Sequence, residues 1–445
     1  MEISDSSEAL DRIESLDTKY GSCGLSAFIN MGNTCYMNSA LQTICANNLM
    51  ISYFSDATSP FYYKKDLEHG CIVKLIKKAS GASEITGEIR ISEKDKKRLF
   101  KKSLSYQLKK ILTYYWSINC KIKPKNFKKS LGEEANPMSI MFSGFGQNDS
   151  HECLMYILDR IHEETKTDVR ISYKTSLPPY VLDYMKNLNS YNELLVTEGI
   201  DKLMLTRDFI RYRIDNIKAA AIYESLESWK TLTKNNHSII TELFAGLYYN
   251  DIVCSKCNNI TFKFETNNTI TLEIPDKISN PTIHDCLNLH FINTELKDDS
   301  AYDCVNCREK CIALKRMKIW NAPLKLIIAF KRFVAFNGSI GKNNKKIAFP
   351  IDNLDLNMYV SEFTNCNAIY NLYATINHSG GPNGGHYIAY AKNKTNDEWY
   401  KYNDDSITAV PKDTIVDKLV DSSTYVLCYE LIPKFKSELK ITPSL

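Results

Sequence analysis

One cysteine stands where a turn meets a helical pattern. Residues 30–34 contain Asn and Gly, and Cys35 follows them directly. Apolar residues then recur at helical spacing over 37–45. Asn33 and Thr34 are good N-cap types, so we expect Cys35 at the N-terminus of a helix, where the dipole favours a thiolate over a thiol. A thiolate here can act as a nucleophile; the alternative is a buried core cysteine.

A histidine and an asparagine far along the chain could complete a catalytic group. Glycines in residues 379–385 predict a loop, and His386 begins the strand pattern that follows it. Asn403 follows a second strand pattern, so antiparallel pairing of the two strands would place Asn403 beside His386. A cysteine protease needs a thiolate, an imidazole, and an amide or carboxylate that holds the imidazole tautomer. The residues alone leave a purely structural histidine equally open.

Two C-x-x-C pairs predict a metal site. Cys254 and Cys257 form the first pair, and Cys304 and Cys307 form the second. In a reducing compartment this spacing is typical of tetrahedral Zn²⁺, and because all four ligand positions are filled we expect structural zinc. The segment between the pairs exceeds a compact zinc ribbon, so further strands must lie within it. Four thiols without metal are the alternative.

Composition limits the classes of protein to which the chain can belong. The 445 residues carry a formal net charge of +4, which is too balanced to argue for nucleic-acid binding. A group of lysines is interpreted as a solvated helix face, with a nuclear signal or a nucleic-acid patch as the alternative; they are Lys96, Lys97, Lys101, Lys102, Lys109 and Lys110. The acidic start has no signal-peptide core, and the longest apolar run, residues 153–158, is too short for a membrane span. We therefore expect a soluble protein of the cytoplasm, the nucleus or both, with its 14 cysteines reduced.

Helical patterns come first along the chain and strand patterns second. Further helices are expected over 100–115 and 146–164, and residues 166–228 are helical and charged without a motif, which indicates an insertion. The expected strands are 247–253, 261–264, 269–274, 325–333, 371–376, 386–391, 399–402 and 425–431. This order predicts an α+β fold.

These segments, in this order, resemble the ubiquitin-specific protease family of cysteine deubiquitinases. Residues 30–42 resemble its cysteine box, and residues 385–390 with 399–405 resemble its histidine box. Residues 147–152 resemble the helix that faces the substrate tail. The resemblance covers about residues 24–432.

The resemblance assigns catalytic roles. It implies that Cys35 is the nucleophile, that His386 is the general base and acid, and that Asn403 orients His386. It also implies that Asn30 donates to the oxyanion beside the Cys35 N–H, with Asp404 assisting.

Four further residues are implied as substrate contacts. Asp149 and Glu152 match acids that hold the basic tail of ubiquitin, and Gln147 and Tyr387 lie in the same two motifs. An acid at a helix N-terminus that stabilises the dipole is the structural alternative for Asp149 and Glu152, and it is compatible with tail binding.

The fold implied is a papain-like α+β protease with a helical thumb, an antiparallel β palm and zinc-ribbon β fingers. Its expected parts are a flexible leader at 1–23, a thumb at about 24–165, a helical insertion at about 166–228, fingers and palm at about 229–432, and a tail at 433–445. The expected partners are one Zn²⁺, ubiquitin and ubiquitinated proteins, without membrane or nucleic acid.

Some residues depart from the family pattern without removing a catalytic group. Ala27 and Phe28 stand where Gly-Leu is usual, and Asn148 and Cys153 replace a common Gln and Phe. We therefore expect an active enzyme. Two alternatives stay open: a hydrolase of a ubiquitin-like modifier, and a non-catalytic scaffold that binds ubiquitin.

Overall fold

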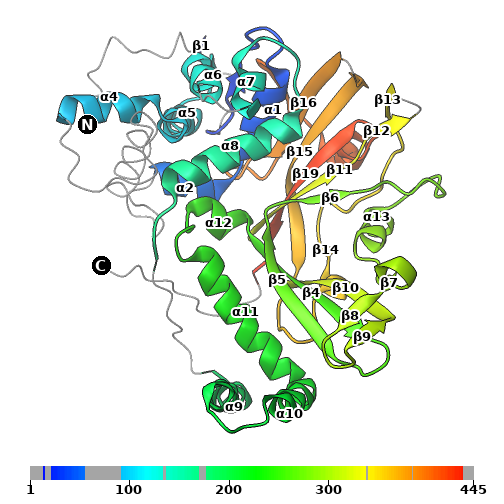
Figure 1. Cartoon of the computed structure of the whole chain (residues 1–445). Helices are drawn as coiled ribbons and strands as arrows, with labels where there is room; N and C mark the ends of the chain where they lie inside the picture. Colours follow the sequence, from blue (N-terminus) through cyan, green and yellow to red (C-terminus); the bar gives the residue numbers. More distant parts are fainter. Residues whose placement is uncertain are drawn as a thin grey trace.

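Figure 1 shows a helical thumb, a central palm sheet, a finger sheet and a three-helix segment that lies beside and below the fingers. The computed structural model describes residues 14–15, 22–55, 92–133, 137–169, 177–336, 339–382 and 384–433. Most of the predicted tail and most of the predicted leader lie outside the described residues. Among the helices that are described, none has the length and apolar content needed to cross a membrane.

The thumb is built around one central helix. Its helices are α1 (Cys35–Cys45), α2 (Asn48–Ser55), α4 (Glu93–Lys102), α5 (Leu104–Ser117), α6 (Lys125–Gly132), α7 (Pro137–Ser143) and α8 (Ser150–Thr165). Every residue of α1 is buried, because the helix lies between α8 and the palm. A small sheet joins β1 (Glu14–Ser15), β3 (Cys120–Ile122) and β2 (Ala27–Phe28). Part of the expected loose leader is therefore paired.

The helix predicted over 100–115 is in fact two helices. Ser103 ends α4 and is also the N-cap of α5, because its hydroxyl accepts a hydrogen bond from the N–H of Tyr106. The Glu164 carboxylate accepts two more, from the N–H groups of Leu104 at 3.0 Å and Ser105 at 2.7 Å. A distant acid therefore helps to set this break, and the local apolar period cannot reveal it.

The palm is one sheet in the order β18-β17-β16-β15-β19-β11-β6, with β14 beside β15. Its strands are β6 (Ile270–Leu272), β11 (Lys325–Phe330), β14 (Leu354–Asp355), β15 (Ile369–Gly381), β16 (Gly384–Lys392), β17 (Trp399–Asn403), β18 (Ser406–Ala409) and β19 (Thr424–Leu431). All pairs are antiparallel except β6 with β11, which is parallel. Apolar side chains cover both faces: the thumb core on one, and a second core that includes α13 (Ile283–His290) on the other.

The strand predicted over 325–333 ends earlier, at Phe330. Arg332 is fully buried, and its guanidinium donates to the carbonyl oxygens of Thr424 at 2.6 Å and Asn343 at 2.9 Å. The chain then starts a separate hairpin of β12 (Phe333–Phe336) and β13 (Ser339–Lys342).

The fingers are a four-stranded sheet in the order β5-β4-β10-β7 with a hairpin at its tip. The strands are β4 (Gly246–Cys254), β5 (Ile260–Asn267), β7 (Thr294–Leu296) and β10 (Ala313–Asn321), and the hairpin is β8 (Tyr302–Cys304) with β9 (Glu309–Cys311). The remaining elements are α12 (Ile239–Phe244), α14 (Ile415–Leu419) and the short helices η1 (Asp298–Ser300), η2 (Asn357–Tyr359) and η3 (Lys412–Thr414). The predicted strands between the two Cys pairs are present.

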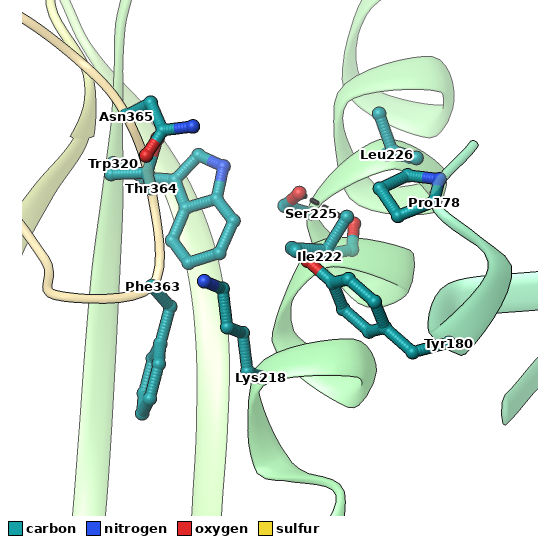
Figure 2. Close-up of a pocket in the computed structure, with 10 residues that line it drawn as sticks. All are labelled: Pro178, Tyr180, Lys218, Ile222, Ser225, Leu226, Trp320, Phe363, Thr364 and Asn365. Carbon is teal, nitrogen blue, oxygen red and sulfur yellow. Dashed lines mark hydrogen bonds between the residues drawn. The ribbon is translucent and has the colours of Figure 1, made fainter. Parts of the chain in front are cut away.

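The predicted insertion is helical, as expected, and it packs on the fingers. It comprises α9 (Pro179–Val196), α10 (Lys202–Asp215) and α11 (Ile217–Thr233), with α11 against β5 and the other two at its far end (Figure 1). A cavity of about 250 Å³ lies between this segment and the end of the finger strand β10 that contains Trp320. Figure 2 shows Trp320 and Phe363 on one side of it and Tyr180 on the other, with Lys218 between them.

Candidate active site

Cys35 opens α1 and lies beside the palm. The helix packs against β16, and the backbone N–H of Tyr387 lies close enough to the Cys35 thiol to lower its pKa. This contact brings the thiol next to the residue that directly follows His386. Cys35 is only 5% exposed, so a reacting group must reach it through the cleft described below.

The turn before α1 is ordered by the side chain of Asn30. Its Oδ1 accepts hydrogen bonds from the N–H of Gly32 at 3.0 Å, and from the N–H and hydroxyl of Thr34 at 3.1 Å and 3.2 Å. Gly32 and Asn33 have φ values of 101° and 52°, which Gly and Asn adopt most readily. Because Oδ1 faces these donors, Nδ2 is directed elsewhere.

His386 and Asn403 meet, as the strand pattern predicted. Strands β16 and β17 pair antiparallel, and His386 Nε2 lies 2.6 Å from Asn403 Oδ1. An amide oxygen can only accept, so Nε2 carries the proton and Nδ1 is the nitrogen that can take a proton from a thiol. The His386 side chain is 44% exposed and can therefore turn toward an incoming substrate.

Asp404 connects the two halves of the site. Its Oδ2 accepts from Asn30 Nδ2 at 2.9 Å, and its Oδ1 accepts from Asn38 Nδ2 at 2.8 Å. Oδ2 also lies 3.9 Å from His386 Nε2. The sequence motifs pointed to Asp404 but not to Asn38. The signal for Asn38 was its place on α1 three residues after Cys35, on the side of the helix that bears the site.

The thiolate expected at Cys35 is not favoured in this site. Burial raises the pKa of Cys35; the N–H of Tyr387 lowers it, and the negative charge of Asp404 raises it. Desolvation of the thiol therefore outweighs the nearby backbone N–H groups, and the shift of the Cys35 pKa is opposite to the one expected from the helix dipole. A thiol with a raised pKa needs a base to react.

A cleft of about 370 Å³ leads to Cys35 between thumb and palm. The Gln147 side chain crosses it, because its Oε1 accepts the N–H of Gly385 at 3.0 Å. The lining residues are Asn33, Cys35, Tyr36, Met141, Gln147, Asn148, Asp149, Phe333, Ile340, His378, Gly381, Pro382, Gly384, Gly385 and Tyr387. Of the predicted substrate contacts, Gln147, Asp149 and Tyr387 line the cleft and Glu152 does not.

The glycine-rich segment is a β-hairpin and not the loop that we predicted. Strands β15 and β16 stay paired as far as Gly381 and Gly384. Gly380 has φ of 113°, and a Cβ at Gly385 would lie 2.2 Å from His378 Nε2. Glycine is needed because the two strands and the His378 ring approach too closely for a side chain, so the glycines extend the pairing.

Asp149 is the N-cap of α8 and also a palm contact. Its Oδ1 accepts from the N–H groups of His151 at 2.7 Å and Glu152 at 3.0 Å. Its Oδ2 accepts from the hydroxyls of Tyr425 at 2.8 Å and Tyr387 at 3.5 Å. The structural alternative for Asp149 is therefore realised, while Glu152 is exposed on the first turn.

His378 is a cleft residue that the sequence analysis missed. Its ring lies 4.5 Å from the ring of Tyr387, and Lys342 Nζ donates to its carbonyl oxygen at 2.7 Å. Burial, together with the Lys342 charge, lowers the pKa of His378 to about 4, so the ring is neutral. The signal was its position beside the same glycines that pointed to His386.

The four predicted metal ligands meet at the tip of the fingers. Cys254 Sγ lies 4.0 Å from Cys307 Sγ, and Cys257 Sγ lies 3.6 Å from Cys304 Sγ. Sulfurs bound about 2.3 Å from a tetrahedral Zn²⁺ are about 3.8 Å apart, so this donor set fits zinc. Burial opposes ionisation, but the N–H groups of Cys257 and Lys256 lower the pKa of Cys254 to about 7, which favours the metal-binding thiolate.

A helix supplies the thiol and a sheet supplies the imidazole, on opposite sides of one cleft. This is the arrangement of a papain-like cysteine hydrolase. The family model described as "Ubiquitin carboxyl-terminal hydrolase" matches residues 26–429. The match covers most of the chain, and the chain belongs to this family of thiol-dependent ubiquitin hydrolases.

Relatives and solved structures agree with this membership. "Probable ubiquitin carboxyl-terminal hydrolase R319" of Acanthamoeba polyphaga mimivirus is 29% identical, over 93% of this chain and 92% of the relative. "Ubiquitin carboxyl-terminal hydrolase 2" of Homo sapiens is 26% identical over 92% of this chain, which spans 55% of that relative. The SAGA Ubp8/Sgf11/Sus1/Sgf73 DUB module bound to ubiquitin aldehyde has the same fold, with a TM-score of 0.55 and 22% identity over 92% of this chain and 70% of that one.

Proposed function

We propose that this chain is an isopeptidase that releases ubiquitin from lysine side chains of ubiquitinated proteins. The observation that carries the proposal is the 2.6 Å contact between His386 Nε2 and Asn403 Oδ1, in a strand that packs against the helix bearing Cys35. Family membership supports ubiquitin as the substrate, as does the ubiquitin seated on structural neighbours.

In the first half-reaction, Cys35 attacks the carbonyl carbon of the terminal glycine of ubiquitin. As the Sγ–C bond forms, the thiol proton passes to His386 Nδ1. Negative charge develops on the carbonyl oxygen, where the Cys35 N–H and the second Nδ2 hydrogen of Asn30 stabilise it. The C–N bond then breaks, and His386 returns the proton to the leaving lysine amine.

The second half-reaction hydrolyses the thioester. His386 Nδ1 takes a proton from water as the water oxygen attacks the carbonyl carbon. The C–Sγ bond breaks, His386 returns the proton to Cys35, and ubiquitin leaves with a free carboxyl group, which loses its proton to solvent. Asn403 keeps the proton of His386 on Nε2 through both halves, so Nδ1 always faces the reaction.

Substrate recognition uses the cleft and the first turn of α8. The cleft suits a tail that ends in glycine, because side chains there would meet Tyr387 and Gln147, which line it. The charges of Asp149 and Glu152 attract the basic part of the tail. Glu152 is exposed, but partial desolvation of its carboxylate and the neighbouring Asp149 charge both raise its pKa, so a cationic partner would stabilise this pair of adjacent carboxylates.

The finger tip holds structural zinc in this proposal. Cys254, Cys257, Cys304 and Cys307 would tie the β4–β5 turn to the β8–β9 turn, and zinc supplies only a cross-link there. Every cysteine in the described part of the chain is free of disulfides, which supports a reducing compartment, the cytoplasm or the nucleus.

The test is a ubiquitin probe with a thiol-reactive C-terminal trap. We expect the wild type to gain the mass of one ubiquitin and Cys35→Ala to gain none. Cys23→Ala is the matched control, because Cys23 is exposed and outside the site. Labelling by a ubiquitin-like probe only would shift the substrate to that modifier. No labelling of folded protein by any probe would leave a ubiquitin-binding scaffold and sink the proposal.

A further inference from the structure

The finger tip holds five thiols, one more than tetrahedral zinc takes. The fifth belongs to Cys311, the last residue of β9, in the hairpin beside β10 in Figure 1. Cys254, Cys304 and Cys311 are buried and pack in one cluster, against which Cys257 and Cys307 are partly buried.

Backbone pairing carries Cys311 into this cluster. Cys304 pairs with Glu309 across the β8–β9 hairpin. Side chains two apart on a strand share a face, so Cys311 lies on the same face as Cys304. The next residue, Ile312, accepts a hydrogen bond from the N–H of Ser255 in the first Cys turn at 3.0 Å. The segment that bears Cys311 is thus fixed to both halves of the metal site.

The sulfur of Cys311 has polar neighbours. The thiols of Cys307 and Cys311 and the carboxylate of Glu309 lie within 4.8 Å of one another. The Cys311 thiol also donates to the Glu309 carbonyl oxygen at 3.5 Å, and it interacts with the Cys254 thiol. A buried cysteine that acts only as a small apolar residue would be surrounded by hydrocarbon instead.

We propose that Cys311 is a reserve zinc ligand that can replace Cys307; this inference rests on the zinc role proposed above. Cys307 lies in the hairpin turn and is the more exposed of the two, so electrophiles reach it first. In the exchange, the bond from metal to Cys307 Sγ breaks and a bond to Cys311 Sγ forms. The proton that Cys311 loses would be taken up by Cys307, or by solvent where Cys307 has been alkylated, so the site would keep its net charge.

The experiment compares zinc content and affinity across variants of the full chain. Cys307→Ala should keep one zinc per chain by native mass spectrometry, and its Co²⁺ form should show the absorption of four thiolates. Cys307→Ala/Cys311→Ala should bind zinc at least about tenfold more weakly, with a three-thiolate Co²⁺ spectrum. Cys311→Ala alone should match the wild type, and Cys307→Ala/Cys23→Ala controls for thiol number. Equal affinities for Cys307→Ala and the Cys307/Cys311 double variant would overturn the proposal.

A second measurement decides the matter if Cys307→Ala does not fold. Native protein is alkylated with limiting iodoacetamide. Native mass spectrometry then gives the zinc content of the chains that are modified only at Cys307. We expect these chains to retain zinc in the wild type and to lose it in Cys311→Ala; loss in both contradicts the proposal. A wild type that binds no zinc would overturn both the reserve role of Cys311 and the proposed zinc site. Labelling by the ubiquitin probe tests the hydrolase activity and does not depend on either result.

Discussion

The side-chain amide of Asn30 donates a hydrogen bond to the carboxylate of Asp404, with 2.9 Å between Nδ2 and Oδ2. Asn30 precedes α1 of the thumb and Asp404 follows β17 of the palm, so this bond links the thumb half of the site to the palm half. One Nδ2 hydrogen is thereby fixed, and the other is the one that can reach an oxyanion.

Asn30→Ala should lower kcat by about two to three orders of magnitude, because it removes an oxyanion donor. KM should change little, since the donor acts only when charge develops on the carbonyl oxygen. Asn30 Oδ1 also orders residues 30–34, so thermal unfolding must be measured beside the kinetics. An unchanged kcat in a folded variant would withdraw the oxyanion role.

Asp404→Asn should have opposite effects on turnover and on the chemistry of the free thiol. The negative charge of Asp404 raises the pKa of Cys35, so its removal should increase the thiolate fraction at pH 7 and speed alkylation by iodoacetamide. Turnover should fall by about 10- to 100-fold, because one amide cannot accept from both Asn30 and Asn38. Slower alkylation in the variant would contradict this account of the charge.

The wild-type thiol should react slowly at neutral pH. Only the thiolate reacts, and burial raises the pKa of Cys35 above its ordinary value. The thiolate fraction at pH 7 is therefore smaller than that of a free thiol, and the alkylation rate should keep rising with pH where a small-molecule thiol has levelled off. Mass spectrometry of the Cys35 peptide across pH gives the profile. A rate that levels off below pH 7 would mean that the helix N-terminus prevails after all.

Gly385→Ala should destabilise the fold by about 1–3 kcal/mol and reduce activity, because the new Cβ would lie 2.2 Å from His378 Nε2 and 2.4 Å from the Ser379 carbonyl oxygen. Urea unfolding gives the stability. Gly381→Ala is the matched control in the same hairpin, where a Cβ meets nothing within 4 Å. Equal losses of stability in both variants would show that close packing at position 385 is not the reason for glycine.

The parts of the site that could be predicted are those positioned by a helix or strand whose apolar residues recur at regular spacing in the sequence. The spacing of apolar residues after Cys35 predicted its helix. Two adjacent strand patterns predicted that His386 and Asn403 lie close together. The contacts between distant segments could not be predicted in this way. The bond between Asn30 and Asp404 spans 374 positions, and the cap that Glu164 gives to α5 has no local signature. Glycines near 380 indicated a loop, although close strand approach explains them better.

The fold class was predictable because the order of helices and strands is itself a local property. The sign of the Cys35 pKa shift was not, because it depends on how completely the palm covers α1. The helix dipole is visible in a sequence pattern, whereas desolvation is a property of the packed structure.

Two neighbouring carboxylates allow a final test that separates a structural role from substrate binding. Asp149→Asn retains an oxygen that can cap α8, and the Tyr425 hydroxyl can turn to accept from the new amide N–H, so the free energy of unfolding should stay near that of the wild type. Asp149→Ala loses the cap and should lose about 0.5–2 kcal/mol. If the charge holds the basic tail, Asp149→Asn should raise KM with ubiquitin substrates. Glu152→Gln is the matched variant, because Glu152 is exposed and caps nothing. It should raise KM without changing urea unfolding. A KM that stays constant in both variants would leave Asp149 as a helix cap and palm contact alone.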